Sequence, residues 1–193
     1  IFNVLQLRVH PSIIALREKV RQSKKNTKFE VELTYLTSRG HWYQTSWKGN
    51  AEKSGGISTN IGVHFYDMLS WIFGEVQENI VHVHETDYAA GYLEFEHARV
   101  KWFLSINSKY IPKEIKEKGQ TTFRSIKING DELEFSGGFT DLHTMVYKDI
   151  LAGKGYGLDA ARTAIEIVHD IRNSKPVGLI SDYHPLLKPK SVT

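Results

Sequence analysis

The sequence predicts an α/β (α+β) domain with an open, mostly antiparallel sheet and helices on one face. Two observations lead to this fold class. Several short segments alternate apolar and polar side chains, as half-buried strands do, and four longer segments repeat apolar residues at helical spacing. The length of 193 residues suits one main hydrophobic core. We therefore expect one principal domain, preceded by a short strand and a helix.

The first part of the chain is predicted to form this strand and helix. Residues 2–8 alternate as a short apolar strand. Residues 10–12 are typical of a helix N-terminus, and the apolar residues that follow share one face of that helix. After a polar break at residues 24–27, residues 29–35 alternate strictly, which predicts a strand with one wet face.

Residues 37–58 carry four glycines and several aromatic and basic side chains, without a regular apolar pattern. We expect a long loop there, and long loops inside compact domains are usually functional. Residues 58–73 then predict a helix that ends at Gly74, because their apolar positions form one stripe. The stripe consists of Ile61, Phe65, Met68, Leu69 and Ile72.

The second half of the chain is predicted to complete the sheet and to end in two helices. Strand-like alternation occurs at residues 80–84, 91–95, 100–106, 122–128 and 132–135. Residues 96–99 and 129–131 are typical turns between neighbouring strands. We expect a meandering antiparallel sheet of about five or six strands. Helices at 142–151 and 158–173 follow, with a glycine-rich turn between them.

Composition and charge argue against several kinds of protein. The net charge of +3 comes from scattered basic residues balanced by almost as many acidic ones, so we expect no nucleic-acid partner. No apolar run is long enough to cross a membrane. Cysteine is absent, and no signal peptide precedes the first residues, which favours a cytoplasmic protein. Because the sequence begins at Ile1 inside a predicted strand, we expect a piece of a longer chain.

A second stripe of side chains runs along the helix at 58–73, beside the apolar one. Asn60, His64, Asp67 and Trp71 form it, since each directly precedes an apolar position. His64 therefore borders the core, where its ring could accept or donate a proton near neutral pH, and Asn60 could fix its tautomer. A structural histidine that bonds Asp67 is the alternative, and the spacing by itself favours that alternative.

Basic and aromatic side chains elsewhere are candidates for binding an anionic substrate. Gln6 and Arg8 lie at the carboxyl end of the first predicted strand, where ligands of open α/β sheets collect. In the predicted loop, Arg39 and Lys53 could supply cations for a phosphate or carboxylate, and Tyr43 a ring face for a base or sugar. A surface ion pair at Arg8 and aromatic packing of the loop are the alternatives.

The sequence predicts neither a metal site nor a dinucleotide site. His82 and His84 share one strand face, but no third ligand has the spacing of a metal centre. Gly153, Gly155 and Gly157 lie between two predicted helices, whereas a dinucleotide loop follows a strand. We therefore expect no cofactor-binding residues in this chain.

The helix at 58–73 is part of a longer motif. Residues 55–67 resemble the G-G-x-x-x-D-x-G-x-H-x-x-D motif of the Gfo/Idh/MocA oxidoreductases. Residues 6–8, 38–43 and 46–49 are similar to a branch of that family whose members oxidise UDP-N-acetylglucosaminuronic acid. The resemblance implies NAD-dependent oxidation at C3 of this UDP-sugar, in the biosynthesis of lipopolysaccharide O-antigen.

The same resemblance implies a two-domain dehydrogenase of which this chain holds the C-terminal part. Residues 1–25 would be the last strand and crossover helix of a Rossmann domain, which binds NAD. Residues 26–193 would be the domain for substrate binding and oligomerisation, forming a homodimer or homotetramer through the sheet face.

His64 would be the catalytic histidine, paired with a lysine that precedes Ile1. Asn60 stands where the family usually has an aspartate, and an amide cannot stabilise an imidazolium by charge. Whether His64 acts as base, relay or orienting residue therefore stays open. A non-catalytic sugar-nucleotide binding module, or a dehydrogenase of another sugar, are the alternative functions.

Overall fold

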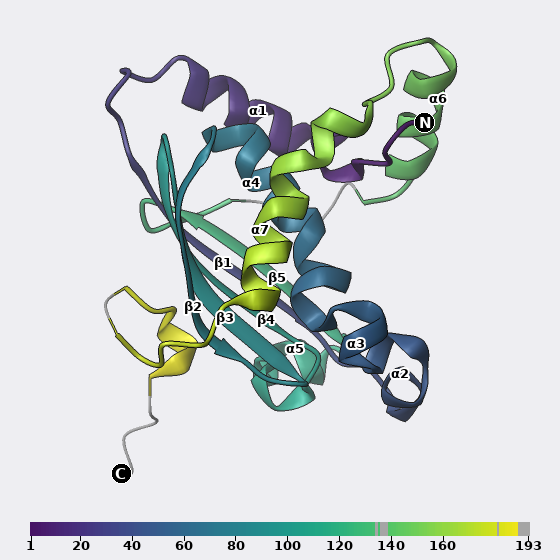
Figure 1. The fold of residues 1–193 in the computed structure, drawn as a ribbon, viewed down its shortest axis with the longest axis vertical. Helices are drawn as coiled ribbons and strands as arrows, with labels where there is room; N and C mark the ends of the chain where they lie inside the picture. Colours follow the sequence, from purple (N-terminus) through teal and green to yellow (C-terminus); the bar gives the residue numbers. More distant parts are fainter. Residues whose placement is uncertain (134, 136–138, 181, 189–193) are drawn as a thin grey trace.

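The computed structural model describes residues 1–133, 135, 139–180 and 182–188. It contains a six-stranded sheet with the strand order β2-β3-β4-β1-β5-β6 (Figure 1). The strands are β1 (Phe29–Thr37), β2 (Val76–His84), β3 (Tyr88–Phe95), β4 (Ala98–Ser105), β5 (Thr122–Ile128) and β6 (Asp131–Glu132). The predicted class, an open sheet of mostly antiparallel strands, is confirmed.

Strand β1 lies in the middle of the sheet, which corrects the expected antiparallel meander. It pairs parallel to β4 and antiparallel to β5, and the other neighbours pair antiparallel. Parallel strands need a long crossover connection, and the chain between β1 and β4 contains one with helices. Leu33 and Leu36, which point to opposite faces, are 0% and 1% exposed, and a strand buried on both faces belongs inside a sheet.

Three helices cover one face of the sheet, as predicted (Figure 1). They are α1 (Pro11–Arg21), α4 (Val63–Phe73) and α7 (Arg162–Asn173), and α4 contacts both of the others. Phe73 of α4 and Trp102 of β4 are fully buried in the core between helices and sheet. A fourth helix, α6 (Leu142–Leu151), packs on the N-terminal segment. Among the described residues, none of the helices is long and apolar enough to span a membrane.

The N-terminal segment does not form the strand predicted at residues 2–8. Gln6–Val9 form a 3-10 helix (η1), and the described part of this segment makes one isolated bridge, between Asn3 and Tyr156. Three consecutive side chains of η1 are buried, because η1 packs against both α4 and α6. Burial of consecutive residues cannot arise in a half-exposed strand, so the apparent alternation misled the prediction.

The segment predicted as a long loop, residues 37–58, contains three short helical turns. They are α2 (His41–Thr45), η2 (Trp47–Gly49) and α3 (Ala51–Ser54). The side chains of Ser46 and Asn50 accept hydrogen bonds from backbone N–H groups at the start of η2 and α3. Such caps stabilise turns that are too short to show apolar periodicity.

The helix predicted at residues 58–73 is confirmed, but its first turn is irregular. Ser58–Gly62 form a π-helical turn (η3) that continues directly into α4. Gly55 and Gly56 precede it with φ angles of 73° and 74°, which glycine adopts without the strain of a side chain. Irregular turns of this kind are frequent at functional sites.

The C-terminal half largely follows the predicted elements. Asn129 and Gly130 form the predicted hairpin turn, with φ angles of 53° and 92°. The helix predicted at 142–151 is α6, and the one predicted at 158–173 begins as a 3-10 turn, η5 (Leu158–Ala161), before α7. Strand β6 ends at Glu132, and residue 134 of the strand predicted at 132–135 lies outside the described residues.

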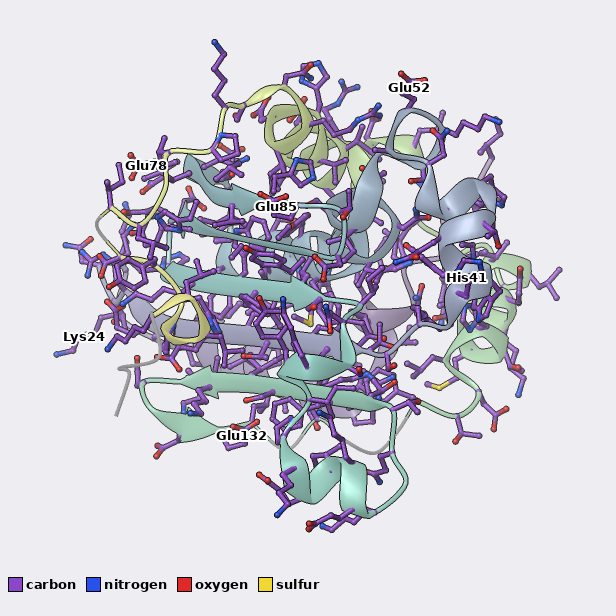
Figure 2. The ribbon with its side chains drawn as sticks, turned by 90° about the horizontal axis from the view of Figure 1, so that it is seen from below. Lys24, His41, Glu52, Glu78, Glu85 and Glu132 are labelled. Carbon is purple, nitrogen blue, oxygen red and sulfur yellow. The ribbon has the colours of Figure 1, made fainter. Side chains whose placement is uncertain are left out.

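The opposite face of the sheet is partly covered by short helices and the C-terminal segment. Figure 2 shows η6 (Pro185–Leu187) in front of this face and α5 (Lys113–Glu117) beyond its β5 edge, and a further 3-10 turn, η4 (Ser108–Tyr110), also packs on this face. Before η6, the backbone N–H groups of Val177 and Gly178 donate to carbonyls of β2. The segment therefore shields part of an edge strand that could otherwise pair with another chain.

His184 attaches this C-terminal segment to the sheet. Its Nε2 atom lies 3.0 Å from Thr34 Oγ1 of β1, and its Nδ1 atom accepts a hydrogen bond from the Leu186 N–H at 3.2 Å. The side chain is 3% exposed. Burial, assisted by Lys127 and Lys101, lowers the pKa of His184 to about 3. The imidazole is therefore uncharged at neutral pH.

We expect folding stability to decrease as the pH falls from 6.5 towards 3, because the unfolded chain binds a proton that the buried His184 excludes. This residue should contribute up to ~1.4 kcal/mol of unfolding free energy per pH unit. Urea unfolding at about pH 5 and about pH 7 measures the effect, which His184→Gln should reduce. The exposed His169 offers a control, and His169→Gln should keep the wild-type dependence. An unchanged dependence in His184→Gln would contradict the assignment.

Candidate active site

The candidate site is a pocket of about 260 Å³ between η1, the first turns of α4 and α6, and the carboxyl end of β1. Its polar lining consists of Gln6, Arg39, Asn60, His64, Arg124 and His143. Its apolar lining consists of Leu7, Tyr35, Ile61, Phe65, Phe139 and Leu142. The structure thus brings together four of the residues singled out from the sequence, namely Gln6, Arg39, Asn60 and His64.

His64 lies at the wall of this pocket on the first turn of α4, with its side chain accessible to solvent. The surrounding protein nevertheless restricts hydration of the ring, which lowers the pKa of His64. The nearby His143 lowers this pKa further, whereas Asp67 opposes the shift. The ring is therefore uncharged at neutral pH and can accept a proton from a bound ligand.

The side chain next to the ring of His64 is Gln6, not Asn60. Gln6 Nε2 lies 3.5 Å from His64 Nδ1, at the outer limit of a hydrogen bond. Asn60 makes no side-chain hydrogen bond with any described residue, and its Nδ2 atom is buried without a partner. Buried amide donors are normally satisfied, so this N–H group is available to a ligand in the pocket. The expected tautomer-fixing bond from Asn60 is thus not present.

Arg8 does not line the pocket, because its guanidinium forms a buried ion pair. Its Nη2 and Nε atoms donate to the two carboxylate oxygens of Asp67, at 2.6 and 3.0 Å, and Nη2 also donates to the Ala160 carbonyl. The two side chains are 7% and 5% exposed. This geometry connects η1, α4 and η5, and it leaves Asp67 paired with Arg8 and not hydrogen-bonded to His64.

Two other candidates from the sequence lie away from the pocket lining. Tyr43 is 5% exposed and belongs to the hydrophobic core, so it packs α2 against the domain as the alternative interpretation proposed. Burial raises the pKa of Tyr43. Lys53 is exposed on α3 and is not among the residues that line the pocket.

The two strand histidines do not assemble a metal centre within the described part of the chain. There, no cluster of three histidine, cysteine, aspartate or glutamate residues could hold a metal ion. His82 is 1% exposed on β2, where the C-terminal segment covers it. Burial lowers the pKa of both His82 and His84.

Two polar residues of the pocket, Arg124 and His143, were not among the candidates predicted from the sequence. Arg124 could have been found, because it occupies the position of β5 that alternates with Ile126 and Ile128. A charged residue in an otherwise apolar register lies on the core side of a sheet. Burying its charge is costly unless the charge is paired or bound to a ligand, so such a residue indicates a site. His143 gives no such signal, since it follows the buried Leu142 on a helix of mixed composition.

A comparison with protein families shows the family to which this chain belongs. The C-terminal α/β domain of an oxidoreductase family matches residues 24–173. The chain therefore belongs to the Gfo/Idh/MocA oxidoreductase family, as the motif at residues 55–67 implied.

Solved structures of similar proteins narrow the comparison. The chain is 48% identical to the WlbA (WbpB) dehydrogenase from Thermus thermophilus in complex with NAD and α-ketoglutarate, with a TM-score of 0.90. The match covers 96% of this chain and 60% of that one. A second structure of the Thermus thermophilus protein, with NAD and UDP-GlcNAcA, matches with a TM-score of 0.88 and 48% identity over 96% of this chain and 59% of that one.

A more distant relative shares the fold. The WlbA dehydrogenase from Bordetella pertussis, in complex with NADH and UDP-GlcNAcA, is 17% identical with a TM-score of 0.66, over 94% of this chain and 64% of that chain. The chain thus spans about 60% of the length of the Thermus thermophilus proteins it resembles.

Proposed function

We propose that this chain is the substrate-binding and catalytic C-terminal part of an NAD-dependent dehydrogenase that oxidises C3 of UDP-N-acetylglucosaminuronic acid. The observation that carries the proposal is the uncharged, accessible His64 in a pocket lined by two arginines. The 48% identity to a dehydrogenase solved with NAD and UDP-GlcNAcA supports the choice of substrate.

In this function His64 accepts the proton of the C3 hydroxyl, and C3 becomes a carbonyl carbon. The buried Asn60 Nδ2 group can donate a hydrogen bond to an oxygen of the sugar, while Gln6 orients the His64 ring. NAD supplies the hydride acceptor when it is bound. No G-x-G-x-x-G loop joins a strand to a helix among the described residues, so the proposed reaction places NAD on a Rossmann domain.

The domain assignment is part of the proposal. Residues 1–25 would belong with the Rossmann domain and residues 26–193 would form the substrate-binding and oligomerisation domain. The product, a 3-keto UDP-sugar, would serve lipopolysaccharide O-antigen biosynthesis in the cytoplasm. Assembly as a homodimer or homotetramer would use the uncovered part of the sheet face opposite the helices, where the partly buried Tyr88 and Tyr110 pack on the buried Phe103.

The test uses the two-domain protein, in which this chain follows its Rossmann domain. With NAD and UDP-N-acetylglucosaminuronic acid, we expect NADH to form together with an equal amount of 3-keto sugar nucleotide. The alternative, a non-catalytic module, predicts binding of the UDP-sugar without NADH. A dehydrogenase of another sugar would give NADH only with other UDP-sugars. Either of these results would contradict the proposed reaction.

A further inference from the structure

Two guanidinium groups in the pocket of His64 have no acidic partner in the part of the chain that the structure describes. Arg39 and Arg124 both line this pocket, whose described lining contains no aspartate or glutamate. Neither side chain forms an ion pair or hydrogen bond with a described residue. Arg8 and Arg99, in contrast, pair with Asp67 and Glu30. Two unpaired cations facing one cavity favour an anionic ligand, because a carboxylate or phosphate can accept paired hydrogen bonds from a guanidinium.

Arg124 is held in place by aromatic rings. Its guanidinium carbon lies 4.2 Å from the ring centroid of Phe139 and 5.6 Å from that of Tyr35. Tyr35 is also its neighbour across the β1–β5 ladder. Stacking on ring faces stabilises the charge without using the N–H donors, which point outward in the plane of the group. The donors of Arg124 therefore remain available to a ligand in the pocket.

The proposed substrate carries two anionic groups that could reach these arginines, a diphosphate at C1 and a carboxylate at C5. C3, which is oxidised, lies two ring bonds from both C1 and C5. Presenting the C3 hydroxyl to His64 therefore brings both anionic groups within one sugar ring of the pocket, and the space in the pocket decides between them.

The size of the pocket favours the carboxylate over the diphosphate. Its volume of about 260 Å³ is that of a small site. Pockets that enclose a drug-sized ligand have ~300–1,000 Å³. The cavity can hold a sugar ring with its substituents, whereas the diphosphate and uridine must lie outside it.

We propose that Arg124, together with Arg39, forms a subsite for the C6 carboxylate and thereby selects a uronic acid over the corresponding neutral hexose. The inference rests on the proposed function, because it takes C3 as the position next to His64. It assigns Arg124 as a specificity-determining residue and leaves the proton transfer to His64.

The test compares two substrates that differ only at C6, in the two-domain protein. UDP-N-acetylglucosaminuronic acid has a carboxylate there, and UDP-N-acetylglucosamine has a hydroxymethyl group. In Arg124→Gln, kcat/KM for the acid should fall ~10²-fold. The loss should appear mainly as a higher KM, because Arg124 would contact the carboxylate in the bound substrate as well as in the transition state. For the neutral sugar it should change by less than about threefold. Arg124→Lys should recover part of the loss, and Arg39→Gln should share the selective effect.

Arg99→Gln is the matched control, because Arg99 pairs with Glu30 on the opposite face of the sheet and is 45% exposed. It should leave both substrates unaffected. An equal loss on both substrates in Arg124→Gln would assign the residue to pocket shape or to the diphosphate, and it would overturn the carboxylate subsite. So would an unchanged kcat/KM for the acid.

Calorimetric titration of the same variants with both UDP-sugars separates the two proposals. Binding that favours the acid and depends on Arg124, without any NADH formation, would overturn the proposed reaction and support the subsite. Oxidation of the acid with a preference that survives in Arg124→Gln would overturn the subsite and support the reaction.

Discussion

If the proposed reaction holds, His64→Ala should lower the kcat of the two-domain protein by ~10²-fold or more, because in that reaction His64 accepts the C3 hydroxyl proton. The wild-type imidazole is accessible in the pocket, and its lowered pKa keeps it uncharged at neutral pH. Both kcat and kcat/KM should fall, because proton transfer is completed only in the transition state. Steady-state rates of NADH formation measure both quantities.

A control and a pH profile make this prediction specific. His169→Ala should keep the wild-type kcat, because His169 is 73% exposed on α7 and does not line the pocket. Wild-type activity should fall as the pH drops below 6.5, since protonated His64 cannot accept a proton, and His64→Ala should lack this acidic limb. Turnover of His64→Ala within about threefold of wild type would show a purely structural histidine.

Arg8→Met should destabilise the fold by ~3–5 kcal/mol, because it leaves the buried Asp67 carboxylate without its partner. The pair is joined by two hydrogen bonds, and a third bond from Arg8 to Ala160 connects η1 to η5. Urea unfolding at neutral pH measures the loss of unfolding free energy. The double variant Arg8→Met with Asp67→Leu should lose less, since no unpaired charge stays buried.

The exposed pair of Arg99 and Glu30 provides the comparison for this prediction. Arg99→Ala should leave the unfolding free energy nearly unchanged, because solvent screens an exposed pair. The sequence suggested instead that Arg8 binds substrate. A raised KM in Arg8→Met with unchanged unfolding free energy would support that function and contradict the structural one.

Elements with local patterns were predictable from the sequence. The helix at 58–73 shows a complete apolar stripe, and the hairpin at residues 129–131 has the Asn-Gly dipeptide of its turn. His64 could also be identified from the sequence, because its position beside the stripe and the motif at residues 55–67 are both local features. In each case the deciding residues lie within a few turns of one another.

Features that depend on distant contacts were not predictable. Strand β1 pairs with β4, which is separated from it by 60 or more residues, so local alternation cannot show that the two are parallel. Arg8 and Asp67 are 59 positions apart. The sequence therefore could not show that the two side chains are buried together as an ion pair. Asn60 lies about one turn before His64, and a regular α-helix would place the two side chains next to each other. The π-helical turn η3 changes this spacing, so the expected contact could not be judged from the sequence.

The hydrogen on C3 of the UDP-sugar gives the decisive measurement of the proposed reaction. UDP-N-acetylglucosaminuronic acid with deuterium at C3 would be incubated with NAD and the two-domain protein, and the nucleotide analysed by mass spectrometry. Hydride transfer from C3 predicts that the deuterium appears in the reduced nicotinamide. Deuterium that stays in the sugar, or that is lost to water, would contradict the assignment of C3 as the carbon beside His64.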